Sequence, residues 1–261
     1  MKASIKQNIL LSFVFSMFSV VAILVLLWVQ GITPSNLPEG VEIPEISPVL
    51  IMVVSSIQFF ITTFVMSLVG LTLAPKVNLH LPFFQSLVDK SNTFTWSRKW
   101  IIISILGGCI GFISLALMDK YVFQPFVPEF GEVAETVWYK GLLAGVLYGG
   151  IWEEIAIRLF LMTLIIWIVS KIFRKKADNI PAWVYWFGII FAAIMFGIGH
   201  LPATQALVGT LTTAIVIRAI VLNGVIGVFC GYLYWKKGLI YAIIAHAFVH
   251  IFHYGILVHI L

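Results

Sequence analysis

The sequence feature that most constrains this chain is a set of long apolar runs. They occupy residues 9–30, 49–73, 100–118, 138–173, 182–200, 213–235 and 239–260. A helix needs about 20 apolar residues to cross the hydrocarbon core of a bilayer. Only 10% of the residues are charged, whereas a typical soluble domain has about 25%. The sequence therefore predicts an all-α, polytopic membrane protein, a helix bundle without a soluble domain.

The linkers between these runs predict the orientation of the chain. Linkers 75–99 and 171–180 are basic, whereas linkers 31–48 and 119–137 are acidic. Cytoplasmic loops carry an excess of Lys and Arg, so the alternation predicts seven crossings and a cytoplasmic N-terminus. The first run is too long for a secretory signal and is expected to remain as an anchor. We expect an integral multi-pass protein of the plasma membrane.

The net charge of +5 does not indicate a nucleic-acid partner, because the basic residues flank the apolar runs instead of forming a patch. Those at the run ends are Lys2, Lys6, Lys76, Lys90, Arg98, Lys99, Lys171, Arg174, Lys175, Lys176, Lys236 and Lys237. This is the distribution expected of a protein that lies in a lipid bilayer. Aromatic residues near run ends further predict interfacial belts, formed by Trp138, Trp183, Trp186, Tyr232, Tyr234, Trp235 and Tyr241.

Run 138–173 has 36 residues, far more than one crossing needs. Its upstream linker is predicted outside and its downstream linker inside, so it should cross an odd number of times. We expect one long or bent helical element here. An eighth transmembrane helix within this run is the alternative.

This long run contains three charged residues, Glu153, Glu154 and Arg158. A charge at the centre of a membrane helix costs about 2.5–3.5 kcal/mol for Asp, Lys or Arg. Glu154 and Arg158 are spaced i, i+4 and can pair on one helix face. Glu153 points about 100° away, which leaves it free to act as a general base. Polar contacts between helices are the structural alternative, and we favour function.

Histidines lie in two other runs, within FGIGH at 196–200 and HAFVH at 246–250. His246 and His250 share one helix face, where they line a site or bridge helices. Together with Glu153, these residues suit hydrolysis. Glu153, helped by His200, would take a proton from water, while His246 and His250 donate to a developing oxyanion. Because three histidines with an open position can hold zinc, a zinc site of His200, His246 and His250 is the alternative.

Three short motifs on separate runs carry a resemblance to a known family. They are EEIAIR at 153–158, FGIGH at 196–200 and HAFVH at 246–250, with a glycine-rich approach at 223–246. The chain resembles the CAAX protease and bacteriocin-processing family of intramembrane endopeptidases, which includes the Ras-converting CAAX prenyl protease. The resemblance covers about 138–254. It implies that 138–261 forms the catalytic core and that 1–137 contributes N-terminal transmembrane helices to one integral domain.

The resemblance implies a role for each motif residue. Glu153 matches the water-activating glutamate, and Glu154 with Arg158 matches the pair that supports it. His200 matches the histidine that holds the water, and His246 matches a donor on the oxyanion side. His250 departs from the family pattern, which has Asn or Asp there. A histidine can donate as Asn does, but it can also bind metal.

The sequence thus predicts an intramembrane endopeptidase that cuts a membrane-associated or prenylated protein or peptide. A glutamate-and-water mechanism implies no tightly bound cofactor, with zinc as the alternative. A non-proteolytic scaffold or bacteriocin immunity protein of the same fold is the second hypothesis. A proton-coupled transporter is disfavoured because no internal repeat is present. Counting from the basic ends places His246 nearer the inner side than Glu153 and His200, so tilt or an unwound segment around 201–212 would be needed to bring them together.

Overall fold

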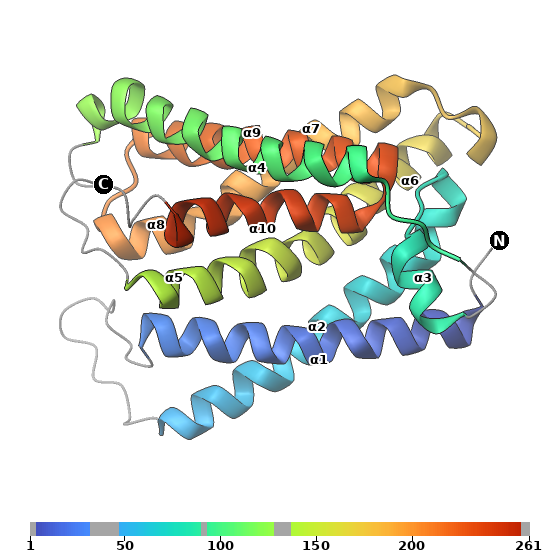
Figure 1. Cartoon of the computed structure of the whole chain (residues 1–261), viewed down its shortest axis with the longest axis horizontal. Helices are drawn as coiled ribbons and strands as arrows, with labels where there is room; N and C mark the ends of the chain where they lie inside the picture. The colour runs from blue at the N-terminus through green and yellow to red at the C-terminus, as the bar shows by residue number, and fades with distance from the viewer. Residues whose placement is uncertain (1–3, 32–46, 90–92, 128–136, 257–261) are drawn as a thin grey trace.

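The structure is a computed structural model that describes residues 4–31, 47–89, 93–127 and 137–256. These residues form helices joined by turns, which run roughly along one direction (Figure 1). The α-helices are α1 (Ile5–Gln30), α2 (Pro48–Leu73), α3 (Pro82–Val88), α4 (Arg98–Met118), α5 (Trp138–Ala144), α6 (Thr163–Ile172), α7 (Ala182–Gly199), α8 (Leu201–Val208), α9 (Thr213–Lys237) and α10 (Leu239–Gly255). The all-α class is confirmed. The predicted topology depended on two acidic linkers, 31–48 and 119–137. Most residues of these linkers lie outside the described residues.

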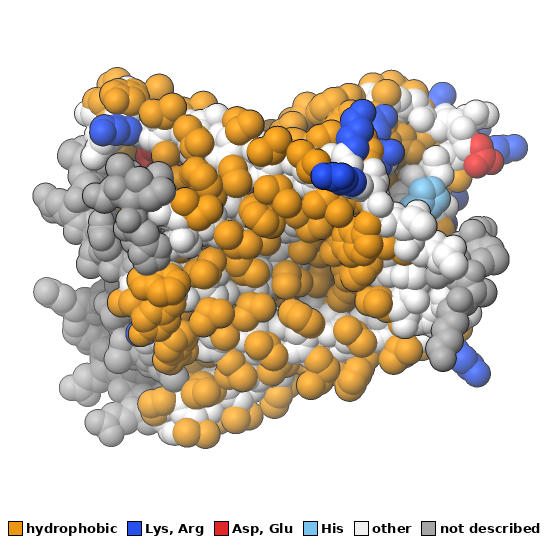
Figure 2. All heavy atoms as spheres, viewed as in Figure 1, with side chains coloured by type: hydrophobic (Ala, Val, Ile, Leu, Met, Phe, Trp, Pro, Cys, Tyr) orange, Lys and Arg blue, Asp and Glu red, His pale blue; other side chains and the backbone are white. Residues whose placement is uncertain are grey.

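Six helical segments within the described residues are long and apolar enough to cross a membrane. They are Ile5–Gln30, Pro48–Val77, Arg98–Phe126, Trp138–Ile172, Ala182–Val208 and Thr213–Lys237. A shorter apolar helix, Leu239–Gly255, follows. The chain is therefore an integral multi-pass membrane protein. Its outer surface agrees with this, since apolar side chains are spread over the described part of the face shown in Figure 2.

Run 138–173 forms a single helical element, Trp138–Ile172, as expected. The element begins as α5, continues as π-helix over Gly145–Glu153 and Ile155–Met162, and ends as α6. No break within it separates an eighth helix.

Local signals in the sequence account for several helix boundaries. The Ser4 hydroxyl accepts a hydrogen bond from the backbone of Gln7, whose side chain accepts one from the backbone of Ser4, a capping box that begins α1. Thr212 caps the start of α9. Gly238 separates α9 from α10 with a φ of 104°, a conformation that favours glycine. This tight reversal places α9 and α10 side by side.

Helix α10 lies at the centre of the bundle, where it contacts α4, α9 and the α5–α6 element. Close approach between α4 and α10 depends on Gly108, because an added Cβ there would collide with the backbone carbonyl of Ala245. A separate pair, α1 and α2, packs against the other side of the α5–α6 element. The site motifs thus lie on helices that meet inside the bundle.

Two of the residues predicted to form interfacial belts are core residues instead. Tyr234 is fully buried, and Tyr241 is 3% exposed. The hydroxyl groups of Tyr234 and Thr163 are hydrogen-bonded at 3.0 Å, and the Tyr241 hydroxyl accepts a hydrogen bond from the backbone of Ser97. Each tyrosine is buried because its polar atom has a partner inside the bundle, which sequence position alone does not reveal.

Candidate active site

Glu154 and Arg158 form the centre of a buried polar network. The Glu154 side chain is fully buried, and its Oε2 atom lies 3.3 Å from Nε of Arg158. Arg158 also donates a 3.3 Å hydrogen bond to the backbone carbonyl of Gly227 on α9. Its guanidinium group lies 5.1 Å from the centre of the Phe196 ring on α7. One ion pair therefore connects three helical elements at a depth where an unpaired charge would be costly.

His246 on α10 joins this network through one of its two ring nitrogens. Its Nδ1 atom lies 2.8 Å from Oε1 of Glu154. An ionised carboxylate only accepts hydrogen bonds, so Nδ1 of His246 carries the hydrogen atom and is the donor of this hydrogen bond. A buried carboxylate in this position orients the imidazole, as in other carboxylate–histidine pairs. The other nitrogen, Nε2, faces Glu153.

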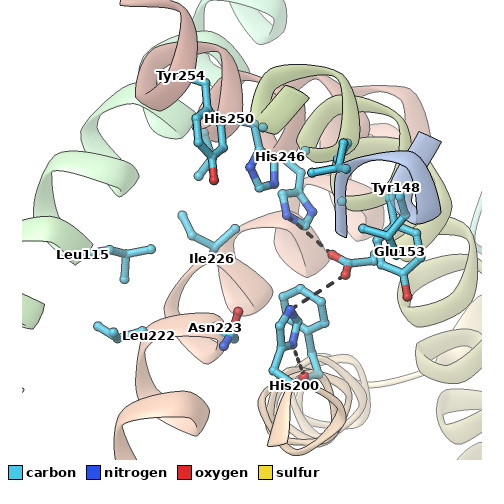
Figure 3. A pocket seen from close by; sticks show the side chains of 18 of the residues that line it. Leu115, Tyr148, Glu153, His200, Leu222, Asn223, Ile226, His246, His250 and Tyr254 are labelled. Carbon is cyan, nitrogen blue, oxygen red and sulfur yellow. Dashed lines mark hydrogen bonds and ion pairs between the residues drawn. The ribbon is translucent and has the colours of Figure 1, made fainter. Parts of the chain in front are cut away.

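Glu153 lies apart from the ion pair, although it is adjacent to Glu154 in sequence. Figure 3 shows its carboxylate between His246 and His200. Its oxygens lie 3.8 Å from Nε2 of His200 and 3.9 Å from Nε2 of His246. Both separations exceed a direct hydrogen bond and suit groups bridged by water. The side chain is 12% exposed, on the wall of a cavity.

His200 is oriented by the helix that precedes it. Its Nδ1 atom donates a 2.8 Å hydrogen bond to the backbone carbonyl of Phe196, which directs Nε2 toward Glu153. In the neutral ring Nε2 is then an acceptor. The Phe196 ring packs edge-on against His200, with 4.7 Å between the ring centres. Phe196 also lies edge-on to His246, so one aromatic ring packs near both histidines and near the Arg158 guanidinium group.

The helical element that carries the acids is wider than an α-helix. Its π-helical turns have i→i+5 hydrogen bonds, which are frequent near functional sites. An angle of 100° between Glu153 and Glu154 therefore does not describe this backbone. The two carboxylates nevertheless face different partners.

His250 lies one turn beyond His246, but it does not contact Glu153. Its ring stacks on His246 at 5.3 Å and packs against Gly145 and Gly149, where an added Cβ would collide with it. Its Nε2 atom is buried without a hydrogen-bond partner. His250 also lines the cavity that contains Glu153. The structure thus places His250 beside the site with an unused polar atom.

The cavity has a volume of about 400 Å³ and is lined by residues of several helices. Sequence analysis did not single out Asn223, Tyr148 or Tyr254, all of which line it. Asn223 lies on the wall facing His200 (Figure 3) and donates to the backbone carbonyl of Ala219. The signal for Asn223 was present, because an amide within apolar run 213–235 needs a polar neighbour.

The predicted difference in depth between the motifs does not keep them apart. In Figure 1 the α6–α7 connection extends farther out than the α9–α10 turn, and α7 is tilted against α10. Basic linkers therefore lie at different depths, and counting residues from them misplaced His246 relative to Glu153. Within the segment 201–212, residues 201–208 form α8, and only residues 209–212 are not helical.

The histidines do not fit the alternative zinc site. An imidazole binds metal in its ring plane, but the His246 and His250 rings are stacked with 22° between their planes, so they do not converge on one ion. Among the described residues, ligand atoms lie within 4.8 Å of one another in a different group, formed by Glu154, Cys230 and His246. Arg158 already pairs with Glu154 in this group, with its Nε atom 3.3 Å from Oε2 of Glu154. A metal there would be repelled by the guanidinium.

Comparison with known proteins supports the motif-based resemblance. Residues 135–252 match the family model described as Rce1-like, type II CAAX prenyl endopeptidase Rce1-like. The matched segment contains Glu153, Glu154, Arg158 and the three histidines of the motifs. Comparison with curated proteins and with solved structures gives no significant match. The segment that contains the site residues is therefore similar to the Rce1-like family of type II CAAX prenyl endopeptidases.

Proposed function

We propose that this protein is an intramembrane endopeptidase that hydrolyses a peptide bond of a membrane-associated or prenylated protein or peptide. The observation that carries the proposal is the position of the Glu153 carboxylate. It faces a cavity between two histidine Nε2 atoms, at 3.8 and 3.9 Å, while its neighbour Glu154 is held by Arg158 and His246. A carboxylate that has room for a water beside it and is not ion-paired with an arginine suits the role of a general base.

Water activation is the first step of the proposed mechanism. A water between Glu153 and Nε2 of His200 donates one hydrogen to each, which aims its oxygen lone pair into the cavity. Glu153 takes a proton as the water oxygen bonds to the substrate carbonyl carbon. His200 keeps its orientation through its hydrogen bond to Phe196. The roles of both residues agree with those that the family resemblance implies.

Charge balance assigns a role to His246 in the second step. The site contains two carboxylates, Glu153 and Glu154, and one permanent cation, Arg158, so it is neutral when His246 is an imidazolium. Its Nε2–H then donates to the oxyanion of the tetrahedral intermediate, and Glu154 stabilises the imidazolium charge. When the intermediate collapses, the C–N bond breaks and the proton on Glu153 passes to the leaving amine. His250 is proposed as a further donor, since its buried Nε2 has no partner.

The topology that accompanies this mechanism is also a proposal. We propose seven crossings with a cytoplasmic N-terminus, in which the 17-residue α10 is the seventh. A helix of this length is at the lower limit for spanning, about 17 residues. Residues 138–261 would form the catalytic core. The N-terminal helices would complete it, because Leu26 and Gln30 of α1 line the cavity.

A proteomic comparison tests the proposed function. Cells that express the wild type are compared with cells that express Glu153→Gln at equal levels, because glutamine keeps the shape of the side chain but cannot accept the proton. The proposal predicts that at least one membrane protein or peptide accumulates uncut with the variant. If no substrate accumulates and the variant retains the full cellular phenotype, a non-proteolytic scaffold or immunity function replaces the protease.

A further inference from the structure

The candidate active-site cavity is located at one end of the bundle. Its lining includes the last residue of α1, Gln30, and Gly141 from the start of α5. It also includes Leu207 of α8 and Tyr254 from the end of α10. In Figure 1 these helix ends lie on the left, opposite the N-terminus. The cavity therefore extends to the end of the bundle that is remote from the N-terminus.

The opposite end of the bundle is closed below the site. Fully buried side chains of the α5–α6 element, α9 and the start of α10 pack together there, and they are Leu159, Met162, Ile166, Leu233, Tyr234 and Leu239. Such packing leaves no room for water. A substrate cannot reach Glu153 through this region.

The closed end also carries most of the basic residues. Those within the described part of the chain are Lys6, Lys76, Arg98, Lys99, Lys171, Arg174, Lys175, Lys176, Lys236 and Lys237. At the cavity end are Lys120 and Lys140, together with Arg218, whose charge is offset by a bidentate ion pair with Asp119 at 2.6 Å. Figure 2 shows most of the blue side chains toward the right-hand end. An excess of Lys and Arg marks the cytoplasmic side of a membrane protein.

A second cavity, of about 620 Å³, adjoins the first between α4, α9 and α10. The two share Asn223, His250 and Tyr254 as lining residues. One part of the second cavity is apolar, with Phe112, Leu115 and Val249. Another part is polar, with Asp119, Lys120 and Gln124 at the end of α4. This lining suits a peptide with an apolar stretch followed by a polar one.

We infer that the catalytic cavity opens on the non-cytoplasmic side of the membrane. Its substrate is then a peptide segment that has already crossed the bilayer and stays anchored at the outer surface. The segment enters between α4, α9 and α10, with its apolar part against Phe112 and Leu115 and its polar part near Asp119 and Gln124. This inference rests on the proposed protease function for its substrate, and on the fold and the distribution of basic residues for its orientation.

Cysteine accessibility tests the orientation without any need for activity. Cys109 and Cys230 are first replaced by alanine in the full-length chain. Single cysteines are then placed at the cavity end, as Leu207→Cys or Gln124→Cys, and at the basic end, as Lys175→Cys or Lys237→Cys. Two positions at each end guard against a variant that fails to fold. The probe is a membrane-impermeant maleimide, applied to intact cells and to permeabilised cells.

The inference predicts labelling of the cavity-end cysteines in intact cells, and labelling of the basic-end cysteines only after permeabilisation. The reverse pattern would overturn it, even if the protein proved to be a protease. In the proteomic comparison with Glu153→Gln, the new N-termini of the wild type should map to the outer side of substrate membrane anchors. Cleavage mapped to the cytoplasmic side would contradict the inference while leaving the proposed function intact.

Discussion

Glu153 and Glu154 are adjacent in the chain but differ in burial and in the residues that surround them. Glu154 is fully buried and contacts both Arg158 and His246 within 3.3 Å. Glu153 lines a cavity and has two histidine nitrogens nearby, neither at hydrogen-bonding distance. The contacts of Glu154 stabilise its negative charge. The surroundings of Glu153 leave its carboxylate able to accept and release a proton. One helix thus supplies both the support and the reactive group of the site.

The largest effect is expected when the support is removed. Arg158→Ala leaves Glu154 as a buried carboxylate without its cation, which costs about 3–5 kcal/mol. His246 would also lose its fixed orientation, so folded yield and activity should fall together. Thermal unfolding of the purified variant in detergent, beside peptide turnover, measures both quantities. Wild-type stability in Arg158→Ala would show that the ion pair does not support the fold.

A smaller effect is expected at the edge of the cavity, where His250 departs from the family pattern. If its ring N–H donates to the oxyanion, His250→Ala should lower turnover by about 10²–10³, the usual cost of one lost donor. His250→Asn should retain substantial activity, because an amide offers the same kind of donor. Turnover of a membrane-embedded reporter at matched expression checks this pair. A folded but inactive Asn variant would exclude the donor role, and an active Ala variant would remove His250 from the site.

The smallest effect is expected on the closed side of the bundle, where Tyr234 contacts Thr163 through its hydroxyl. Tyr234→Phe removes this hydrogen bond, while the Thr163 hydroxyl keeps its bond to the backbone carbonyl of Arg158. The free energy of unfolding should fall by about 1 kcal/mol, with turnover unchanged. The same unfolding and turnover assays apply. A strong loss of activity would mean that this side of the network takes part in catalysis.

The membrane helices could be predicted well from the sequence, because an apolar run of spanning length has few other folds available. The length and flanking charges of run 138–173 predicted one element, and the i, i+4 spacing predicted the pairing of Glu154 with Arg158. These features are local. Each depends on residues that are close together in the chain, so tertiary packing did not change them.

The partner of His246 could not be predicted, because it depends on how α10 lies against the α5–α6 element. The sequence assigned His246 to the oxyanion and did not pair it with Glu154. The buried position of Tyr234 was missed for the same reason. Tilt between helices also brought Glu153, His200 and His246 together despite their different distances from the basic linkers. Features formed by three helices at once require the three-dimensional arrangement.

The most direct test of the account compares Glu153→Gln with Glu154→Gln, two isosteric changes at adjacent positions. Both purified variants are measured for thermal unfolding and for turnover of one membrane-embedded peptide. The account predicts that Glu153→Gln unfolds like the wild type but loses about 10²–10⁴ in turnover, the range for a general base. Glu154→Gln should lose stability as well, because Arg158 would then lack its counter-charge. Equal stability of the two variants, or an active Glu153→Gln, would contradict the division between a supporting and a reactive carboxylate.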